Sequence, residues 1–128
     1  MKIKWKLGLL AQVSLFYNGL ILFAVAMNYE WVKTRAAGGQ FEEFPISIRV
    51  AYLLMFSGTI FLMFFLYDLL NGSPSERALR AARYLGYLFI LSTAMQVISP
   101  SADERFNAVP AAIISYTFLL IGRNKLNK

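Results

Sequence analysis

Residues 48–70 read IRVAYLLMFSGTIFLMFFLYDLL, an apolar stretch with its two charged side chains close to the ends. A helix needs about 20 predominantly apolar residues to cross a bilayer, and this stretch is long enough. Residues 7–27 form a second stretch of sufficient length. Two shorter ones, residues 84–98 and 106–122, need their flanking residues to complete a crossing. The four stretches together predict an all-α integral membrane protein.

The apolar stretches and their flanks use most of the chain, so we expect a single transmembrane domain over residues 1–128. Its architecture is predicted to be a four-transmembrane-helix bundle. The predicted helices cover residues 7–28, 46–71, 74–99 and 102–123, with a loop at 29–45. The chain is 58% hydrophobic, above the roughly 45–50% that is usual for soluble domains. The loop is either a plain connector or a place where function gathers.

The chain contains no cysteine and no histidine. Their absence excludes disulfides, thiol nucleophiles, histidine bases and most zinc, copper and haem sites. No phosphate-binding loop, dinucleotide-binding glycine pattern or nucleophile elbow is present either. We therefore expect no cofactor, no metal and no catalytic residue, and the sequence is not recognised as a member of a known family.

The distribution of basic residues predicts the orientation in the membrane. Nine of the 13 Lys and Arg residues fall on the side that would hold both termini, and four fall on the other. Short cytoplasmic loops carry the excess of Lys and Arg, so both termini are expected in the cytoplasm, in a prokaryotic-type cytoplasmic membrane. This placement also accounts for the net charge of +6 without nucleic acid as a partner.

A cleaved signal peptide is the alternative reading of the first apolar stretch. Ala24-Val25-Ala26 has the small-residue pattern of a cleavage site. The apolar stretch before it is, however, about twice the 7–15 residues of a usual signal core. We therefore expect a retained membrane helix.

Two turns are strongly specified. Gly72 suits a left-handed helix end, and Ser73, Pro74 and Glu76 form a capping-box pattern for the next helix. Residues 101–104 repeat the pattern before the fourth helix. We therefore predict tight antiparallel hairpins between the second and third helices and between the third and fourth.

Small residues recur every four positions in the third predicted helix, at Ala78, Ala82 and Gly86. This spacing is typical of a seam at which another helix approaches closely. The pattern does not say whether that helix belongs to the same chain. The second helix carries an aromatic and methionine stripe that could line a hydrophobic ligand site, although such stripes more often face lipid or pack.

No charged residue is expected at mid-depth in the bilayer, where charged groups usually mark function. Neutral polar residues at similar depths form a possible polar path, consisting of Asn18, Ser92, Gln96 and Ser115. The alternative is simple hydrogen bonding between helices, worth about 0.6 kcal/mol on average.

Two groups of charges are expected at the cytoplasmic interface. Asp68 ends the second helix, where the helix dipole disfavours an anion, so an ion pair with Arg77 or Arg80 is predicted. A basic rim is expected to attract anionic lipids. The rim consists of Lys4, Lys6, Arg80, Arg83 and Arg123.

These features favour a small membrane protein without a catalytic centre that acts by helix packing, as an accessory subunit of a larger membrane complex or as a homo-oligomer. The alternative is an oligomeric channel or facilitator for a small neutral or hydrophobic solute. A membrane enzyme is the third reading, and its chemistry would be limited to Asp68, Asp103 and Glu104.

Overall fold

The computed structural model describes residues 2–33, 35–36, 39 and 41–123, and every regular element within these ranges is helical. The α-helices are α1 (Lys2–Ala26), α2 (Ile46–Asn71), α3 (Glu76–Val97), α4 (Ala102–Arg105) and α5 (Ala108–Gly122), and a 3-10 helix, η1 (Glu30–Val32), follows α1. The all-α prediction is therefore confirmed for the described residues, and the limits of α2 agree with those predicted.

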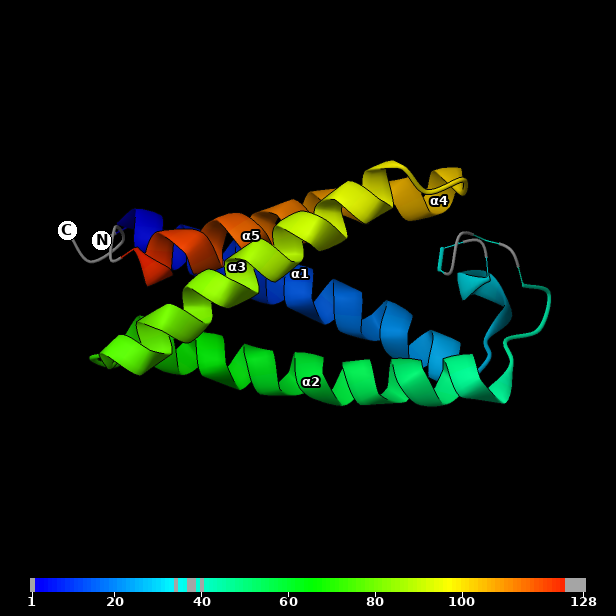
Figure 1. Cartoon of the computed structure of the whole chain (residues 1–128), viewed down its shortest axis with the longest axis horizontal. Coiled ribbons are helices and arrows are strands. Elements are labelled where there is room, and N and C mark those ends of the chain that lie inside the picture. The colour runs from blue at the N-terminus through cyan, green and yellow to red at the C-terminus, as the bar shows by residue number, and fades with distance from the viewer. Residues whose placement is uncertain (1, 34, 37–38, 40, 124–128) are drawn as a thin grey trace.

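The four long helices form two antiparallel pairs (Figure 1). Helix α1 packs on α2, α3 packs on α5, and a contact between α1 and α5 joins the pairs. The start of α1, the end of α5 and the turn between α2 and α3 lie at one end of the molecule, called the terminal end below. The α1–α2 loop and α4 lie at the other, the loop end.

The prediction of a tight hairpin between α2 and α3 is wrong. The two helices are consecutive, but they do not pack along their length because each packs on a different partner. Gly72 ends α2 with extended dihedrals (φ −111°, ψ −168°) instead of the predicted left-handed ones. Its N–H still bonds to the carbonyl of Asp68, at 2.9 Å. The connection therefore leaves α2 without folding α3 back along it.

The start of α3 also differs from the prediction. Ser75, not Ser73, caps the helix by accepting a hydrogen bond from the N–H of Ala78 at 3.1 Å. The helix therefore begins at Glu76, two residues later than expected, and it ends at Val97 instead of residue 99. Pro74 precedes the cap, where its missing N–H costs no helical hydrogen bond.

The predicted fourth helix is divided into α4 and α5. Ser101 caps α4 as expected, accepting from the N–H of Glu104 at 3.3 Å. The division falls at Phe106 and Asn107 because Pro110 has no N–H to donate to the carbonyl of Phe106. Val109 donates to that carbonyl instead, at 3.3 Å. The predicted close pairing of the third and fourth helices is formed by α3 and α5.

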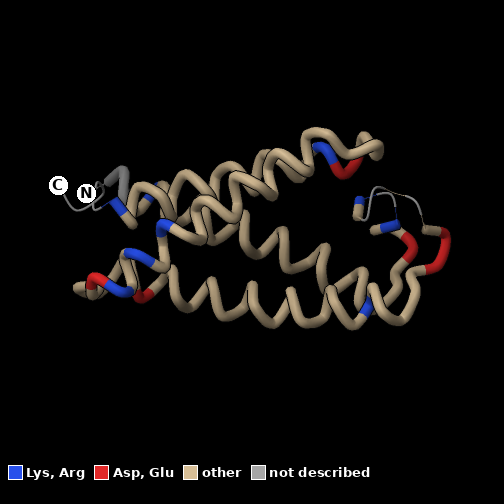
Figure 2. Tube along the Cα trace, viewed as in Figure 1, with Lys and Arg blue, Asp and Glu red and all other residues tan. Residues whose placement is uncertain are grey.

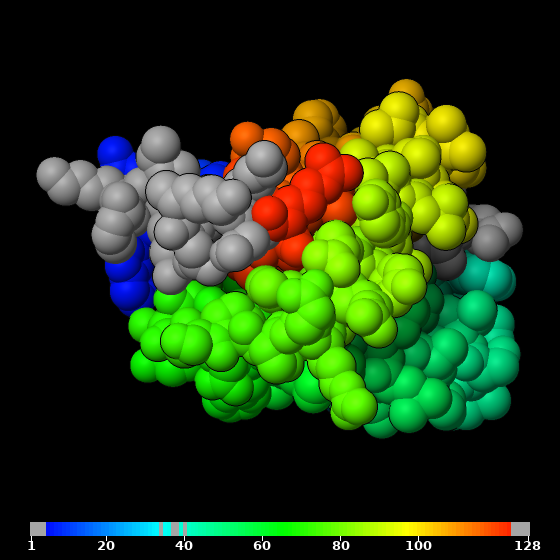
Figure 3. Space-filling model, turned by 60° about the vertical axis from the view of Figure 1, so that its left-hand side comes forward, coloured from blue at the N-terminus to red at the C-terminus, as the bar shows by residue number. Residues whose placement is uncertain are grey.

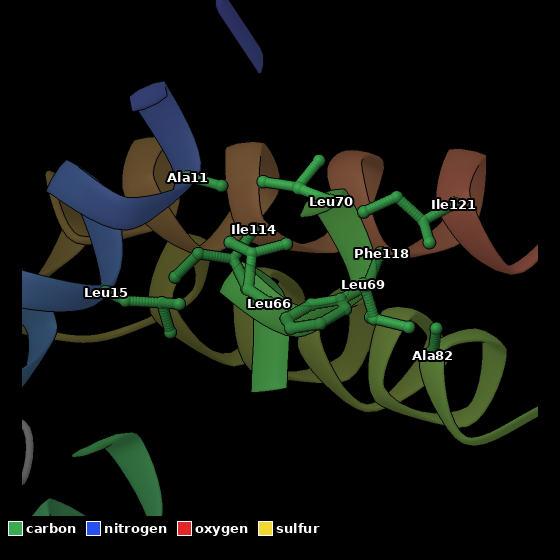
Figure 4. Packing of buried hydrophobic residues seen from close by; sticks show 9 residues of the cluster. All are labelled: Ala11, Leu15, Leu66, Leu69, Leu70, Ala82, Ile114, Phe118 and Ile121. Carbon is green, nitrogen blue, oxygen red and sulfur yellow. The ribbon is translucent and has the colours of Figure 1, made fainter. Parts of the chain in front are cut away.

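All four long helices meet at the terminal end in one apolar core (Figure 4). Phe118 of α5 is fully buried at its centre, with Leu66 of α2 and Leu15 of α1. Ala82 contributes from α3. Helices α2 and α3 are thus held in one cluster near the terminal end, although they do not pack against each other elsewhere.

Three segments are long and apolar enough to cross a membrane, namely Trp5–Ala26, Ile46–Asn71 and Ala102–Gly122. The third segment covers both α4 and α5. Helix α3 is not among them, because its first turns carry charged side chains. Of the four expected membrane spans, three therefore have the required length and composition, and the fourth, α3, has both charged and apolar segments.

Candidate functional site

A cleft of about 820 Å³ lies between α2 and α3 in the half of the molecule near the loop end. We call it the α2–α3 cleft. Figure 1 shows α3 diverging from α2 towards the loop end, and Figure 3 shows the face of the molecule on which α3, in yellow-green, and α2, in green to teal, both lie. The volume of the cleft is within the roughly 300–1,000 Å³ that is usual for pockets that bind small molecules. The cleft exists because the predicted hairpin is not formed.

The lining of the cleft changes from apolar to polar along its length. The deeper part is largely apolar, with Met55, Leu62, Leu88, Phe89 and Leu91, although Asn18 and Thr59 also line it. The part near the loop end carries most of the polar and charged groups, beside apolar residues such as Met95 and Ile98; the polar and charged residues there include Arg35, Gln96, Ser99, Glu104 and Asn107. Leu88 and Gln96 are eight residues apart on α3, so the gradient extends over about 12 Å at 1.5 Å per residue.

Three of the four residues of the predicted polar path line this cleft, namely Asn18 of α1 and Ser92 and Gln96 of α3. The fourth, Ser115, lies elsewhere. Its hydroxyl is buried between α5 and α3 and donates to the carbonyl of Gly86 at 2.7 Å. Gln96 has a buried Oε1 with no hydrogen-bond partner among the described residues. Such an atom is costly in an apolar environment unless a donor reaches it.

The α1–α2 loop closes the loop end of the bundle as a packed structure. Asn28 adopts a left-handed conformation (φ 60°) that ends α1. The N–H of Tyr29 bonds to the carbonyl of Ala24 at 3.0 Å, as in a Schellman motif. Apolar loop side chains then pack on α1 in a second cluster, whose buried members are Ile21, Ala24, Val25, Val32, Ala36 and Phe44. The described part of the loop is therefore packed against α1.

A small ionic network holds this loop. The buried Lys33 Nζ lies 3.0 Å from Glu30 Oε1 and 3.2 Å from Glu43 Oε1. The hydrogen bond to Glu30, more than any other contact, raises the pKa of Lys33 above 10.5. Glu43 accepts hydrogen bonds from Asn28 and from Lys33, and these hold the pKa of Glu43 below 4.5. Both groups are therefore charged at neutral pH.

Asn107, which sequence reasoning missed, joins three segments of the chain beside the cleft. Its Oδ1 accepts from the Tyr17 hydroxyl of α1 at 2.8 Å, and its Nδ2 donates to the carbonyl of Arg35 in the loop at 3.0 Å. The Asn107 residue is buried, and its neighbours in the sequence are the apolar residues Phe106 and Ala108. A polar side chain inside an apolar stretch, three residues before Pro110, is the sequence signal that marks it.

The predicted small-residue seam is used inside the chain. Gly86 approaches α5 so closely that an added Cβ would lie 2.5 Å from Leu119 Cγ. Ala82 is fully buried in the core, and Ala78 is half-buried beside it. The seam therefore packs against α5 of the same chain.

The predicted ion pair of Asp68 with Arg77 or Arg80 is not formed. All three side chains are exposed, and no ion pair joins Asp68 to either arginine. The diverging axes of α2 and α3 account for the difference. Arg83 Nη2 lies 3.9 Å from Glu76 Oε1 instead, and its Nη1 donates to the carbonyl of Gly122 at 2.6 Å.

The other members of the predicted basic rim lie at the terminal end (Figure 2). Lys6, Arg80 and Arg123 are exposed there, whereas Arg83 is partly buried by its contacts with α5. The side chain of Lys4 lies outside the described part of the structure. The middle of the bundle carries no charged residue in the described ranges.

The three acids considered for an enzyme do not come together. Asp68 is near the terminal end, whereas Asp103 and Glu104 are in α4 at the loop end. Within the described ranges, no group of three or more acidic residues could hold a metal ion. Comparisons with protein families, with curated proteins and with solved structures find no match for this chain.

Proposed function

We propose that this chain is a small integral membrane protein, without a catalytic centre, that binds an amphipathic lipid in the α2–α3 cleft. The observation that carries the proposal is the lining of the cleft. It combines a largely apolar deep part with a mouth that carries most of the polar and charged side chains. A lipid likewise has an apolar acyl chain at one end and a polar head group at the other.

In a bilayer, a lipid is a better occupant of the cleft than water. An apolar cavity of this kind does not hold water well, since each water needs two to four polar partners. Lipid chains surround any bundle in a membrane and can enter a groove that opens between two helices. Met55 and Leu88 would contact a chain at no polar cost.

The proposed topology keeps both termini in the cytoplasm of a prokaryotic-type membrane, with the loop end outside. Three apolar segments support insertion. Helix α3 would complete the bundle, with its arginines reaching the phosphate level by snorkelling. The exposed Lys6, Arg80 and Arg123 would then meet anionic head groups at the cytoplasmic surface.

Passage of a solute through one chain is less well supported than binding. The cleft is lined by Leu62 and Leu88 at its deep part, and the packed core around Phe118 and Leu66 lies beyond, towards the terminal end. A facilitator would need that core to open. A lipid-binding site needs no such change.

Assembly with a second copy or with a larger membrane complex is the second candidate function. Its surface cannot be the small-residue seam, which α5 covers. The outer face of α2 offers one such surface, because α2 packs on α1 alone over most of its length. Its exposed apolar side chains include Leu54, Phe61, Phe64 and Tyr67.

Gly58→Leu tests the lipid-binding proposal. A Cβ at Gly58 would have no heavy atom within 4 Å, so the larger side chain enters the cleft without a clash. Native mass spectrometry from mild detergent should show lipid bound to the wild type and a several-fold loss in the variant, with unchanged helicity. Ser57→Leu, on the outward side of the same helix and outside the lining of the cleft, is the matched control. Equal lipid retention in all three proteins would contradict the proposal.

A further inference from the structure

Two polar side chains that line the α2–α3 cleft, Asn18 of α1 and Ser92 of α3, form no hydrogen bond with any described residue. The fully enclosed polar side-chain atoms without a partner belong to Gln12 and Gln96 instead. The Asn18 amide and the Ser92 hydroxyl are therefore accessible, and a molecule in the cleft can reach them. The amide offers two N–H groups, and the hydroxyl offers one O–H.

Ser92 differs from the other hydroxyl residues that lie beyond the first turns of the long helices. A helical Ser or Thr can donate to the carbonyl four residues earlier. Five such bonds of 2.7–3.2 Å are formed, by Ser14, Ser57, Thr59, Thr93 and Thr117. Ser115 donates to the carbonyl of Gly86 on α3. Ser92 forms neither kind of bond with a described residue, so its hydroxyl is available to a ligand.

Ser92 lies between the deep part of the cleft and its mouth. It is four residues from Leu88, in the deep part, and four from Gln96, nearer the loop end, so about 6 Å separates it from each along α3.

Asn18 has a similar position on α1. The preceding residue, Tyr17, donates to Asn107 Oδ1 near the mouth at 2.8 Å. A Cβ at the following residue, Gly19, would lie 3.6 Å from Thr59 Cγ2 in the deep part. Asn18 and Ser92 are thus two polar groups at the boundary between the polar mouth and the largely apolar deep part.

Resting on the proposed lipid-binding function, we propose that the bound lipid is an ester-linked lipid, and that Asn18 Nδ2 and Ser92 Oγ donate hydrogen bonds to its ester carbonyls. The polar head then lies at the mouth, and the acyl chains follow the deep part past Leu88. Head group, ester and chain follow one another in this order in an acylglycerol lipid. The lining of the cleft has the corresponding order of mouth, hydrogen-bond donors and apolar side chains.

Ester carbonyls match these two side chains because a carbonyl oxygen accepts hydrogen bonds and does not donate them. A diacyl lipid supplies two carbonyl oxygens for the three hydrogens of Asn18 Nδ2 and Ser92 Oγ. A plain hydrocarbon chain at this position would leave those hydrogens without an acceptor, which is costly in an apolar environment. Each hydrogen bond of this kind contributes roughly two- to tenfold in affinity.

The test compares lipids that differ in the carbonyls alone. The intact wild-type chain in mild detergent is titrated with a diacyl phospholipid and with its dialkyl ether analogue, which has the same head group and chain length. Bound lipid is counted by native mass spectrometry. The ester lipid should bind roughly tenfold more tightly than the ether lipid, because two hydrogen bonds are lost.

A long-chain quinone is the second arm of the titration. It supplies ring carbonyls but has no charged head group for the mouth, so it should bind less tightly than the ester lipid.

Two substitutions assign the effect to the two side chains. Asn18→Leu and Ser92→Ala should each reduce the preference for the ester lipid several-fold, with little change in the affinity for the ether lipid. Thr93→Val is the control for Ser92, since the Thr93 hydroxyl already donates to the carbonyl of Phe89 at 2.7 Å and does not line the cleft. Asn71→Leu makes the Asn18 change outside the cleft. Both controls should keep the preference, and circular dichroism checks the helicity of every variant.

The outcomes distinguish this inference from the function on which it rests. Equal affinity for the ester and ether lipids overturns the inference and leaves the lipid-binding function standing. So does an ester preference that survives both Asn18→Leu and Ser92→Ala, or a quinone that binds more tightly than the ester lipid. A wild-type protein that retains none of these lipids contradicts the lipid-binding function as well. The ester and ether comparison is made on the wild type, so it decides the question even if a variant does not fold.

Discussion

The terminal half of the bundle and its loop half use the same four helices in different ways. Near the termini, α2 and α3 both contribute to one core around Phe118. Near the loops they separate, and the space between them is the α2–α3 cleft. The loop half is held by the second apolar cluster on α1, by polar contacts of Asn107 and by the Lys33 network. One apolar core thus joins all four long helices at one end, whereas at the other end a smaller apolar cluster and several hydrogen bonds lie beside a cavity.

The largest effect is expected at the centre of the packed half. Phe118→Ala leaves a cavity among four helices, and we expect it to lower the free energy of unfolding by about 3–5 kcal/mol. Thermal or denaturant unfolding in detergent measures the loss. Phe64→Ala, on the exposed face of α2, is the control and should cost far less. Equal losses would mean that the terminal core does not hold the helices together.

Asn107→Leu tests the polar half. The change removes the hydrogen bonds to Tyr17 and to the carbonyl of Arg35, leaving both groups unpartnered, at a cost of about 2 kcal/mol. We expect the α1–α2 loop to become more susceptible to protease while the terminal half stays folded.

The control for Asn107 is Asn71→Leu. The Asn71 side chain donates only to the carbonyl of Tyr67 in its own helix, at 2.9 Å, so this change should leave the loop protected. An Asn107→Leu protein with a loop as resistant as that of the wild type would show that Asn107 does not hold the loop.

The Lys33 network makes the loop half sensitive to pH. The lowered pKa of Glu43 gives stability that is present above about pH 4.5 and is lost as the pH falls through the folded-state pKa. The raised pKa of Lys33 gives stability that is present below pH 10.5 and is lost at higher pH. Loop protection against protease should therefore be greatest between these limits. Glu43→Gln should remove the acid-side loss, whereas Glu42→Gln should keep it.

The smallest effect is expected for Asp68→Asn at the terminal end. Asp68 forms no ion pair with Arg77 or Arg80, and its charge at the end of α2 opposes the helix dipole. The melting temperature should stay the same or rise slightly, by the equivalent of about 0.3 kcal/mol. Glu76→Gln, at the favourable start of α3, should lower it instead. A clear decrease in the melting temperature of Asp68→Asn would contradict this account and support the predicted ion pair.

The sequence predicted the elements better than their arrangement. The limits of α2 follow from Pro45 and Gly72, which bound an apolar stretch. The depths of Asn18, Ser92 and Gln96 follow from the helical rise, and all three line one cleft. Ser115 has a similar depth but lies on the face of α5 that packs on α3. Spacing along a helix fixes depth, whereas the choice of partner helix fixes which faces meet.

The cleft itself could not be predicted because it depends on long-range choices. The seam at Ala82 and Gly86 predicts a close partner but does not identify it as α5. Once α5 takes that face, α3 is drawn away from α2. The role of Asn107 likewise depends on Tyr17 and Arg35, which are 90 and 72 residues away in the chain. No local pattern encodes those pairs.

The divergence of α2 and α3 is the central claim, and it can be measured directly. The chain has no cysteine, so two pairs of spin labels can be introduced without a background signal. One pair, at Tyr67 and Arg80, lies near the turn, and the other, at Val50 and Ile98, lies near the loop end. All four side chains are exposed. In lipid, the second distance should be clearly longer than the first. Equal distances would mean a closed hairpin without a cleft, and they would contradict the account.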